Sequence, residues 1–425
     1  TGASNVAVGR DALLANTTAA NNTAVGKSAL AANTTGAGNT AVGHTTMTTN
    51  TTGTLNAAFG RDSLGLNTTG SNNTAVGESA LYANTTADNN TAVGKSALVA
   101  NTTGTRNTAV GAYAADANTT GGSNSVLGIA ALTSNTTGGS NVAIGDQALS
   151  ANTTGGNNTA VGTGALLTNT TASSNTGIGK DALYYNTTGA SNTALGDSAL
   201  ETNTTASNNT AIGASALFAN TTGDRGAALG KSALAANTTG TENVGIGYLA
   251  MDANTTGAAN TAVGSEALGA NTTSNYNVAV GTAAMILNTT GASNVAVGAL
   301  ALDANTTASN NVAVGYASLG ANTTGTNNVA VGTNALDAVT TANNNIAIGL
   351  DALSGAAGNQ NVAIGTDGQK VSTAANNTSV GYLAMQANTS GAGNAAVGKT
   401  ALTTNTTGTL NAALGQDALG LNTTG

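Results

Sequence analysis

Aliphatic and polar residues follow a fixed frame that repeats along the whole chain. Most copies have the form N-[TV]-A-[VIL]-G-x-x-A-L-x-x-N-T-T-G-x-x, and the glycine in fifth place recurs from Gly9 to Gly349 in steps of 17 residues. Two steps of 16, to Gly365 and Gly381, and two more of 17 complete 25 copies. A single unit of this size cannot bury a core, so the period indicates units that stack on one another.

The start of each unit has the pattern of a short β-strand. Its second and fourth positions are aliphatic or threonine and lie two residues apart, which is the side-chain period of a strand. The NTTG segment would break a helix in every copy, because Asn and Gly favour turns. We therefore predict an all-β, parallel β-solenoid of about 25 coils, each with two short strands. At the roughly 4.8 Å spacing of strands it would be a rod about 120 Å long.

The core is expected to be filled by two apolar columns, the fourth and the ninth positions of the unit. The fourth is aliphatic or Phe in all copies, and the ninth is nearly always Leu or Met. Stacking places like residues on like, so each column would form a continuous buried row. The residues that represent the predicted core are Val25, Ile144 and Val161 from the fourth position and Leu30, Leu149 and Leu166 from the ninth.

Two asparagine columns accompany the apolar ones. The first position, represented by Asn22 and Asn141, is Asn in 24 of 25 copies, and the twelfth, represented by Asn33 and Asn152, is Asn in 22. One interpretation is a pair of ladders in which stacked amides bond to each other and to turn backbone. The other is N-linked glycosylation, because N-T-T fits the acceptor rule. The two are compatible only if the twelfth position points outward.

The third position varies less than a solvent-facing position should. It is Ala in 21 of 25 copies, and by alternation it would face away from the second and fourth positions. A small residue that does not drift on an outer face suggests that another surface packs against it. We therefore predict a contact between chains through Ala24, Ala41, Ala143 and Ala160, which would make the rod a homo-oligomer.

A slower repeat is superimposed on the short one. The sequence of residues 36–70 returns, with few changes, at 391–425, which is 355 residues later. We interpret residues 1–425 as one continuous repeat array and as a piece of a longer chain. The pattern is irregular at 339–375, where the twelfth-position Asn is missing from three consecutive units, two of them short. A joint in the rod is predicted there, at Val339, Gly355 and Gly368.

The composition of the chain argues against disulfide bonds, nucleic-acid binding, membrane spans and catalytic or metal sites. There is no Cys, charged residues make up 7% of the chain, and the net charge of −8 is spread thinly. The sequence therefore offers no disulfide framework, no basic stripe for nucleic acid and no apolar run as long as a membrane span. His44 is the only histidine and occupies the variable sixth position. We predict no catalytic residue, no metal site and no cofactor.

The first half of the unit resembles a known repeat. SNVAIGDQAL (140–149), NNTAVGKSAL (21–30) and NNVAVGYASL (310–319) resemble the head repeats of trimeric autotransporter adhesins, although the usual repeat of that family is shorter and lacks ANTTG. The whole NTAVGxxALxxNTTG array is similar to arrays in bacterial and phage-like tail-fibre-domain proteins. These resemblances imply a left-handed β-roll, chains packed side by side as a trimer or higher oligomer, and a place outside the cell or on its surface.

The expected function is structural. A stiff shaft would space an adhesive tip, which is not in this sequence, from a cell or particle, and that tip would contact the cell-surface target. Ice binding is the main alternative, since Thr34, Thr35 and their equivalents recur in each coil. Carbohydrate binding along the rod is a further alternative, but it would need a repeated aromatic residue that the unit lacks.

Overall fold

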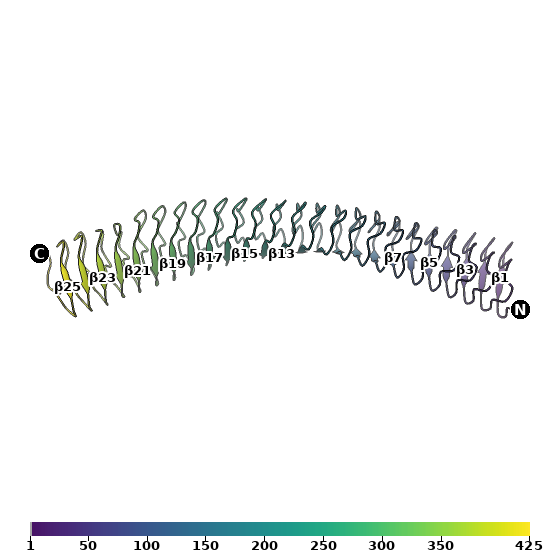
Figure 1. The fold of residues 1–425 in the computed structure, drawn as a ribbon, viewed down its shortest axis with the longest axis horizontal. Helices are drawn as coiled ribbons and strands as arrows, with labels where there is room; N and C mark the ends of the chain where they lie inside the picture. The colour runs from purple at the N-terminus through teal and green to yellow at the C-terminus, as the bar shows by residue number, and fades with distance from the viewer. Residues whose placement is uncertain (1) are drawn as a thin grey trace. The chain divides into compact units, whose positions relative to one another are not determined.

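The computed structural model describes residues 2–425 and confirms the all-β parallel solenoid. Contacts divide the chain into two units, Thr1–Ala214 and Ser215–Gly425. Each unit is a stack of coils, and each coil contributes one three-residue strand (Figure 1). No helix occurs among the described residues.

The strands of the first unit are β1 (Val6–Val8), β2 (Thr23–Val25), β3 (Thr40–Val42), β4 (Ala57–Phe59), β5 (Thr74–Val76), β6 (Thr91–Val93), β7 (Thr108–Val110), β8 (Ser125–Leu127), β9 (Val142–Ile144), β10 (Thr159–Val161), β11 (Thr176–Ile178), β12 (Thr193–Leu195) and β13 (Thr210–Ile212). Those of the second unit are β14 (Ala227–Leu229), β15 (Val244–Ile246), β16 (Thr261–Val263), β17 (Val278–Val280), β18 (Val295–Val297), β19 (Val312–Val314), β20 (Val329–Val331), β21 (Ile346–Ile348), β22 (Val362–Ile364), β23 (Thr378–Val380), β24 (Ala395–Val397) and β25 (Ala412–Leu414).

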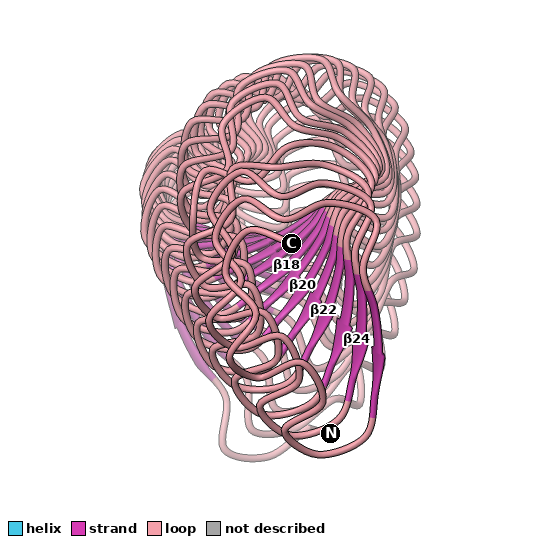
Figure 2. Cartoon of the chain, turned by 90° about the vertical axis from the view of Figure 1, so that its left-hand side faces the viewer, coloured by secondary structure: helices cyan, strands magenta, loops and turns pink. Residues whose placement is uncertain are grey.

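Within each unit, consecutive strands pair in parallel and without any shift of register. In the first unit, for example, Ala160 of β10 lies between Ala143 of β9 and Gly177 of β11. The same register holds across the two short coils of the second unit, where Ala347 pairs with Ala363 and Ala363 with Ser379. Figure 2 shows β18 to β24 following one another along one face of the stack. Each position of the repeat therefore forms a column.

The expectation of two strands per coil was wrong. Only the second to fourth positions form a strand, and the rest of the coil is turns and bends. In the turns, Asn21, Ser28 and Leu30 have φ values of 60°, 58° and 51°. A left-handed conformation is uncommon for Leu. At Leu30 this conformation is stabilised by the neighbouring coil, because the Leu30 N–H donates to the Thr46 carbonyl of the next coil at 3.0 Å.

The predicted orientation of the strand was also wrong. Ala24, Ala41, Ala143 and Ala160 are fully buried inside their own chain. The fourth-position residues point outward instead: Val25 and Val161 are half-buried, and Ile144 is 38% exposed. The prediction for the ninth position is confirmed, because Leu30, Leu149 and Leu166 are fully buried.

The narrow interior of the coil explains this reversal. At Gly177, which replaces the third-position Ala, an added Cβ would lie 3.4 Å from Cγ of Leu166 and 3.1 Å from the carbonyl oxygen of Ala182. Leucine from the opposite side of the coil thus reaches across the core, and only one methyl group fits against it. The third position stays small because its own chain packs on it, which removes the need for a second chain there.

Both asparagine columns are buried ladders that brace the coil. Nδ2 of Asn141 and Nδ2 of Asn152 both donate to the carbonyl oxygen of Gly155, at 3.0 Å each. Asn152 Nδ2 also donates to Oδ1 of Asn135 in the preceding coil at 2.9 Å, and Asn141 Oδ1 accepts the backbone N–H of Asn158 in the following coil at 3.0 Å. Each amide therefore ties its own coil shut and links it to a neighbour.

This arrangement leaves the NTT asparagines unsuited to carry glycans in the folded coil. Asn33 is fully buried, and its Nδ2 donates to the Gly36 carbonyl at 2.9 Å and to Asn16 Oδ1 at 3.0 Å. Asn22 is buried as well, with its Nδ2 bonded to the same Gly36 carbonyl. Of the two interpretations of the sequence, the hydrogen-bond ladder describes the structure.

Candidate functional site

The outer face of the strands carries an aliphatic stripe. Its residues occupy the fourth position, which the sequence placed in the core. Phe59, Leu195 and Leu229 are each more than 40% exposed, although all three keep the apolar character of the column. A column that faces outward, half-buried or exposed, and yet is apolar in every coil is unusual, since outward positions of a soluble surface normally drift toward polar residues. This stripe is the main candidate interaction surface.

The second position adds a parallel column to this face. In the first unit it is mostly Thr, as at Thr159, Thr176 and Thr193, which are half-buried or exposed. In the second unit, six consecutive strands from β17 to β22 have aliphatic residues at both outward positions. These residues are Val278, Val280, Val295, Val297, Val312, Val314, Val329, Val331, Ile346, Ile348, Val362 and Ile364.

The threonine pairs do not form the double row that ice binding would need. Thr34 uses its hydroxyl to donate to the Thr51 carbonyl of the next coil at 3.1 Å, and it is half-buried. Thr35, its neighbour in sequence, is exposed. The column of Thr34 therefore uses its hydroxyls to bond the backbone of the next coil, whereas the column of Thr35 is exposed to water.

The irregular segment interrupts the twelfth-position ladder. At Val339 a buried valine replaces Asn, so it offers no amide to Asn322 of the preceding coil. Among the described residues, the buried side-chain oxygens without a hydrogen-bond partner are Asn322 Oδ1, Asp337 Oδ1 and Gln369 Oε1. All three lie in or beside this segment. A buried unpaired acceptor costs about 1–3 kcal/mol, so these coils are braced less well than their neighbours.

Polar substitutions in the short coils partly compensate for one another. Gln369 replaces the core leucine, and its Nε2 donates to the Val362 carbonyl at 2.8 Å and to Ser379 Oγ at 3.1 Å. Ser379 is itself the residue that replaces the buried third-position Ala of the next coil. On the surface, Lys370 Nζ joins Asp351 and Asp367 at 3.0 and 2.7 Å. The predicted joint residues Gly355 and Gly368 lie in these same two coils.

Amide hydrogen exchange should be fastest in this segment among the interior coils of the second unit. We expect residues 339–376 to exchange about tenfold or more faster than residues 278–322, because a lost buried hydrogen bond lowers local opening free energy. Mass-spectrometric exchange on the intact chain measures both segments at once. Equal protection of the two segments would contradict a weak joint.

Three hollows lie on the edge of the coil formed by the seventh, tenth and eleventh positions. Each contains a glycine at the tenth position: Gly65, Gly269 and Gly420. The missing side chain leaves a gap between the larger residues of adjacent coils. The hollows at Gly65 and Gly269 have volumes of about 240 and 340 Å³.

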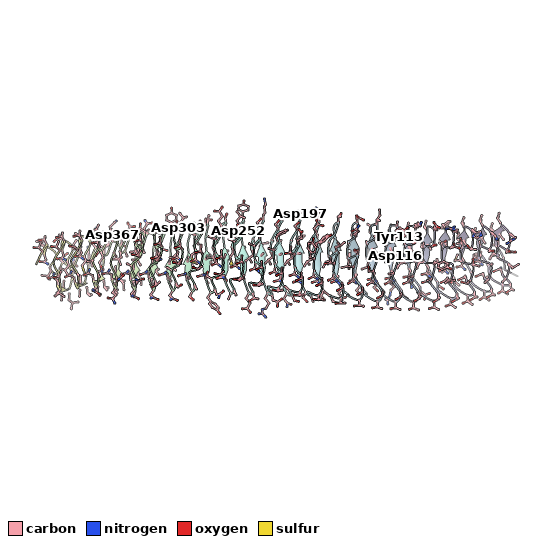
Figure 3. The ribbon with its side chains drawn as sticks, turned by 90° about the horizontal axis from the view of Figure 1, so that it is seen from above. Tyr113, Asp116, Asp197, Asp252, Asp303 and Asp367 are labelled. Carbon is pink, nitrogen blue, oxygen red and sulfur yellow. The ribbon has the colours of Figure 1, made fainter. Side chains whose placement is uncertain are left out.

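Acidic residues at the tenth position pack over such glycines. Oδ1 of Asp303 lies 3.3 Å from where a Cβ on Gly320 would be, and Oδ1 of Asp252 lies 3.5 Å from the same point on Gly269. Figure 3 shows Asp252, Asp303 and Asp367 along one edge of the second unit. Partial burial raises the pKa of both Asp252 and Asp303 above the ordinary value for aspartate.

Replacing Asp303 by Asn should stabilise the second unit at pH 7. A raised folded-state pKa means that the folded chain binds more protons than the unfolded chain, so Asp303 lowers stability as pH rises through its pKa. The gain from Asp303→Asn should disappear at acid pH, where Asp303 is protonated. Denaturant unfolding at several pH values tests this, with Asp146→Asn at an exposed site as control. Equal stability of the variant and the natural chain at pH 7 would contradict it.

His44 is exposed, and its Nδ1 lies 3.0 Å from the Thr45 hydroxyl. Within residues 2–425, no three His, Cys, Asp or Glu side chains gather as metal ligands would. No helix long and apolar enough to cross a membrane occurs in the same residues. Comparison with models of known families and with curated proteins finds no match to this chain.

Proposed function

We propose that the chain is the structural shaft of an extracellular fibre or filament, in which copies of the solenoid pack side by side through their strand faces. The observation that carries this proposal is the aliphatic fourth-position stripe, which lies in register on consecutive coils of each unit. The shaft acts as a spacer and performs no catalysis.

A second copy of the chain is the partner that fits this face best. Apolar patches on monomeric proteins rarely exceed a few hundred Å², whereas the stripe runs along every coil of each unit. A partner must repeat its own contacts at the roughly 4.8 Å strand spacing to match it coil for coil. An identical solenoid meets that condition automatically. The resemblance to trimeric autotransporter heads makes three chains the expected number and the cell exterior the expected location.

Ice binding is the second candidate, and one observation favours it. Thr and aliphatic residues face outward side by side on the regular strand array of the first unit, as at Thr159 and Val161. From β17 to β22, however, the threonine column gives way to Val and Ile. The feature common to the whole face is its apolar character. An apolar face is better suited to packing against another chain than to ordering water. Thermal hysteresis of a dilute solution distinguishes the two functions.

A single introduced cysteine tests the proposed packing directly, because the natural chain has none. Val161→Cys places a thiol on the strand face, and Thr154→Cys places one on an exposed turn of the preceding coil. With a short bis-maleimide, Val161→Cys should give covalent dimers at low protein concentration, and Thr154→Cys should give few. Equal yields from the two positions, or none from Val161→Cys, would count against packing through this face.

A further inference from the structure

The hollow at Gly65 is lined by three threonines, an aspartate, a glycine, a leucine and a tyrosine. Thr45, Thr48 and Thr49 of one coil face Asp62, Gly65 and Leu66 of the next, and Tyr82 of the coil after that closes one side. The Tyr82 ring lies over the glycine, because a Cβ on Gly65 would be 2.8 Å from its Cδ2 and Cε2. Glycine is therefore required at this position for the ring to lie where it does.

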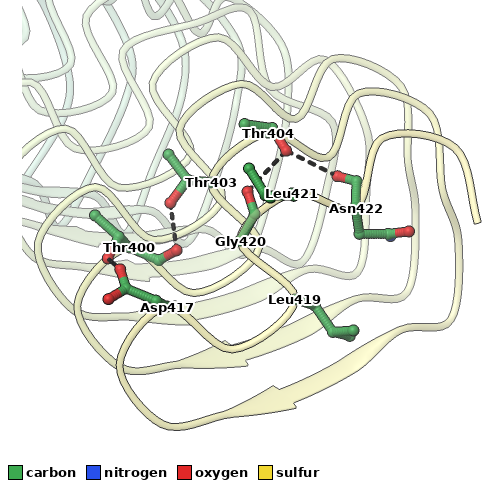
Figure 4. A pocket seen from close by; sticks show the side chains of 8 residues that line it. All are labelled: Thr400, Thr403, Thr404, Asp417, Leu419, Gly420, Leu421 and Asn422. Atoms are coloured by element: carbon green, nitrogen blue, oxygen red, sulfur yellow. Dashed lines mark hydrogen bonds between the residues drawn. The ribbon is translucent and has the colours of Figure 1, made fainter.

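The threonines, the aspartate and the glycine of this hollow recur 355 residues later, as Thr400, Thr403, Thr404, Asp417 and Gly420. They line a hollow there together with Leu419, Leu421 and Asn422, and no aromatic residue is among the lining. Figure 4 shows Thr400 bonded to Asp417, and Thr404 bonded to the carbonyl oxygens of Gly420 and Asn422. The first copy has the matching bonds, from Thr45 to Asp62 and from Thr49 to the carbonyl oxygens of Gly65 and Asn67, the latter two at 3.0 Å.

The threonines of this lining are not a general consequence of the coil. Thr45 and Thr400 are the only threonines at the seventh position of any copy. The hollow at Gly269 has the same place in its coils, yet Leu249, Ile286 and Leu287 line much of it. The hollow at Gly269 also has Asp252 and Glu266 in its lining, so the threonines are what belong to one place in the super-repeat. They return when the super-repeat returns.

Its chemistry suits a neutral ring that carries several hydroxyl groups. Asp62 is half-buried and offers carboxylate oxygens as acceptors. The hydroxyls of Thr45, Thr48 and Thr49 already donate within the chain, so their oxygens can accept hydrogen bonds from the hydroxyl groups of the ring. Tyr82 is 38% exposed and provides an aromatic face for the C–H side of such a ring. At about 240 Å³ the hollow lies just below the range of pockets for drug-sized ligands. That size fits one sugar ring rather than a longer segment.

Other ligand classes fit less well. The carboxylate of Asp62 disfavours an anion, and it is the only acidic side chain that lines the hollow, which is too few for a tightly held cation. An apolar peptide side chain would cover the Asp62 carboxylate without donating a hydrogen bond to it.

We propose that this hollow is a monosaccharide-binding subsite, present once per super-repeat, through which the shaft contacts glycans. Sugar binding at this subsite goes beyond the role of the shaft as a spacer, and it does not depend on self-association of the chain. Its residues come from the seventh, tenth and eleventh positions, whereas the strand face is formed by the second and fourth. The chain can therefore bind sugar on its edge while its strand face is covered.

Saturation-transfer NMR on the intact chain, with the methyl glycosides of glucose, galactose, mannose and N-acetylglucosamine as probes, tests the proposal. At least one glycoside should receive saturation. The double variant Asp62→Asn/Asp417→Asn should weaken its binding about tenfold, and Tyr82→Ala should weaken the contribution of the first copy. Glu266→Gln, in the hollow at Gly269, is the matched control and should bind sugar as the natural chain does.

Two results would overturn the proposal: no saturation of any of the four glycosides, or undiminished binding by the double variant when its circular dichroism shows intact coils. The solution mass of each variant is measured in parallel. If a variant loses sugar binding while its solution mass stays the same, the loss reflects the subsite and not the packing of chains. A chain that is monomeric but binds sugar would reject the packing proposal and keep this one.

Discussion

Replacing Ala160 by Leu should destabilise the first unit, whereas replacing Val161 by Asp should leave its fold intact. Ala160 is fully buried, and the interior of the coil has room for one methyl group at its position, as the contacts at Gly177 indicate. Overpacking of this kind costs about 1–3 kcal/mol and sometimes more. Val161 is half-buried on the outer face, so its replacement should cost less than about 1 kcal/mol.

Denaturant unfolding of the two variants under the same conditions measures this difference. The expected order is the reverse of what side-chain polarity alone suggests, since the apolar-to-apolar change is the harmful one. A Val161→Asp variant that unfolds more easily than Ala160→Leu would show that the fourth position lies in the core after all.

Replacing Gly162 by Ala should strongly destabilise the first unit, although it adds a single methyl group. Gly162 has a φ of 135°, a conformation that residues with a side chain rarely adopt. An added Cβ would lie 2.4 Å from the carbonyl oxygen of Gly179 in the next coil, and neither backbone can move without breaking the stack. We expect a loss of about 3–5 kcal/mol, measured by denaturant unfolding.

Gly164 provides the matched control two residues later. Its φ of 68° lies in the left-handed region that Ser28 and Ser79 occupy at the same position of other coils, with φ of 58° each. The nearest atom to an added Cβ is Oδ1 of Asp181, the end of a movable side chain. Gly164→Ser should therefore cost less than about 1 kcal/mol. Similar losses for Gly162→Ala and Gly164→Ser would reject this account of the turn.

The column pattern predicted the solenoid correctly, because stacked coils place equivalent residues of successive repeats next to one another and a repeating sequence therefore gives continuous columns. Leu30 and its equivalents were recognised as core, and Asn22 and Asn33 as ladder residues, because each recurs with the coil. The period alone does not say which side of a strand faces inward. That depends on the width of the coil, which Leu166 sets by reaching across to the third position of the next coil.

Two other features had weaker signals in the sequence. Nothing in the composition of the turns indicated that Ser28 and Leu30 adopt positive φ, so a second strand was a reasonable prediction for that segment. The hollows had a partial signal, because glycine occupies the tenth position at Gly65, Gly269, Gly320 and Gly420, and three of these four glycines line a hollow. Tyr82 does not recur with the 17-residue unit, so the sequence alone offered no reason to interpret it as more than an isolated surface residue.

The solution mass of the 425-residue chain, measured by light scattering, tests the central claim that the strand face joins copies of the solenoid. The account predicts a multiple of 40.2 kDa. It also predicts a fall toward the single-chain mass when Val280, Val297, Val314 and Val331 are all replaced by Asp. A natural chain that scatters as a single 40.2 kDa molecule at concentrations well above micromolar would contradict the claim.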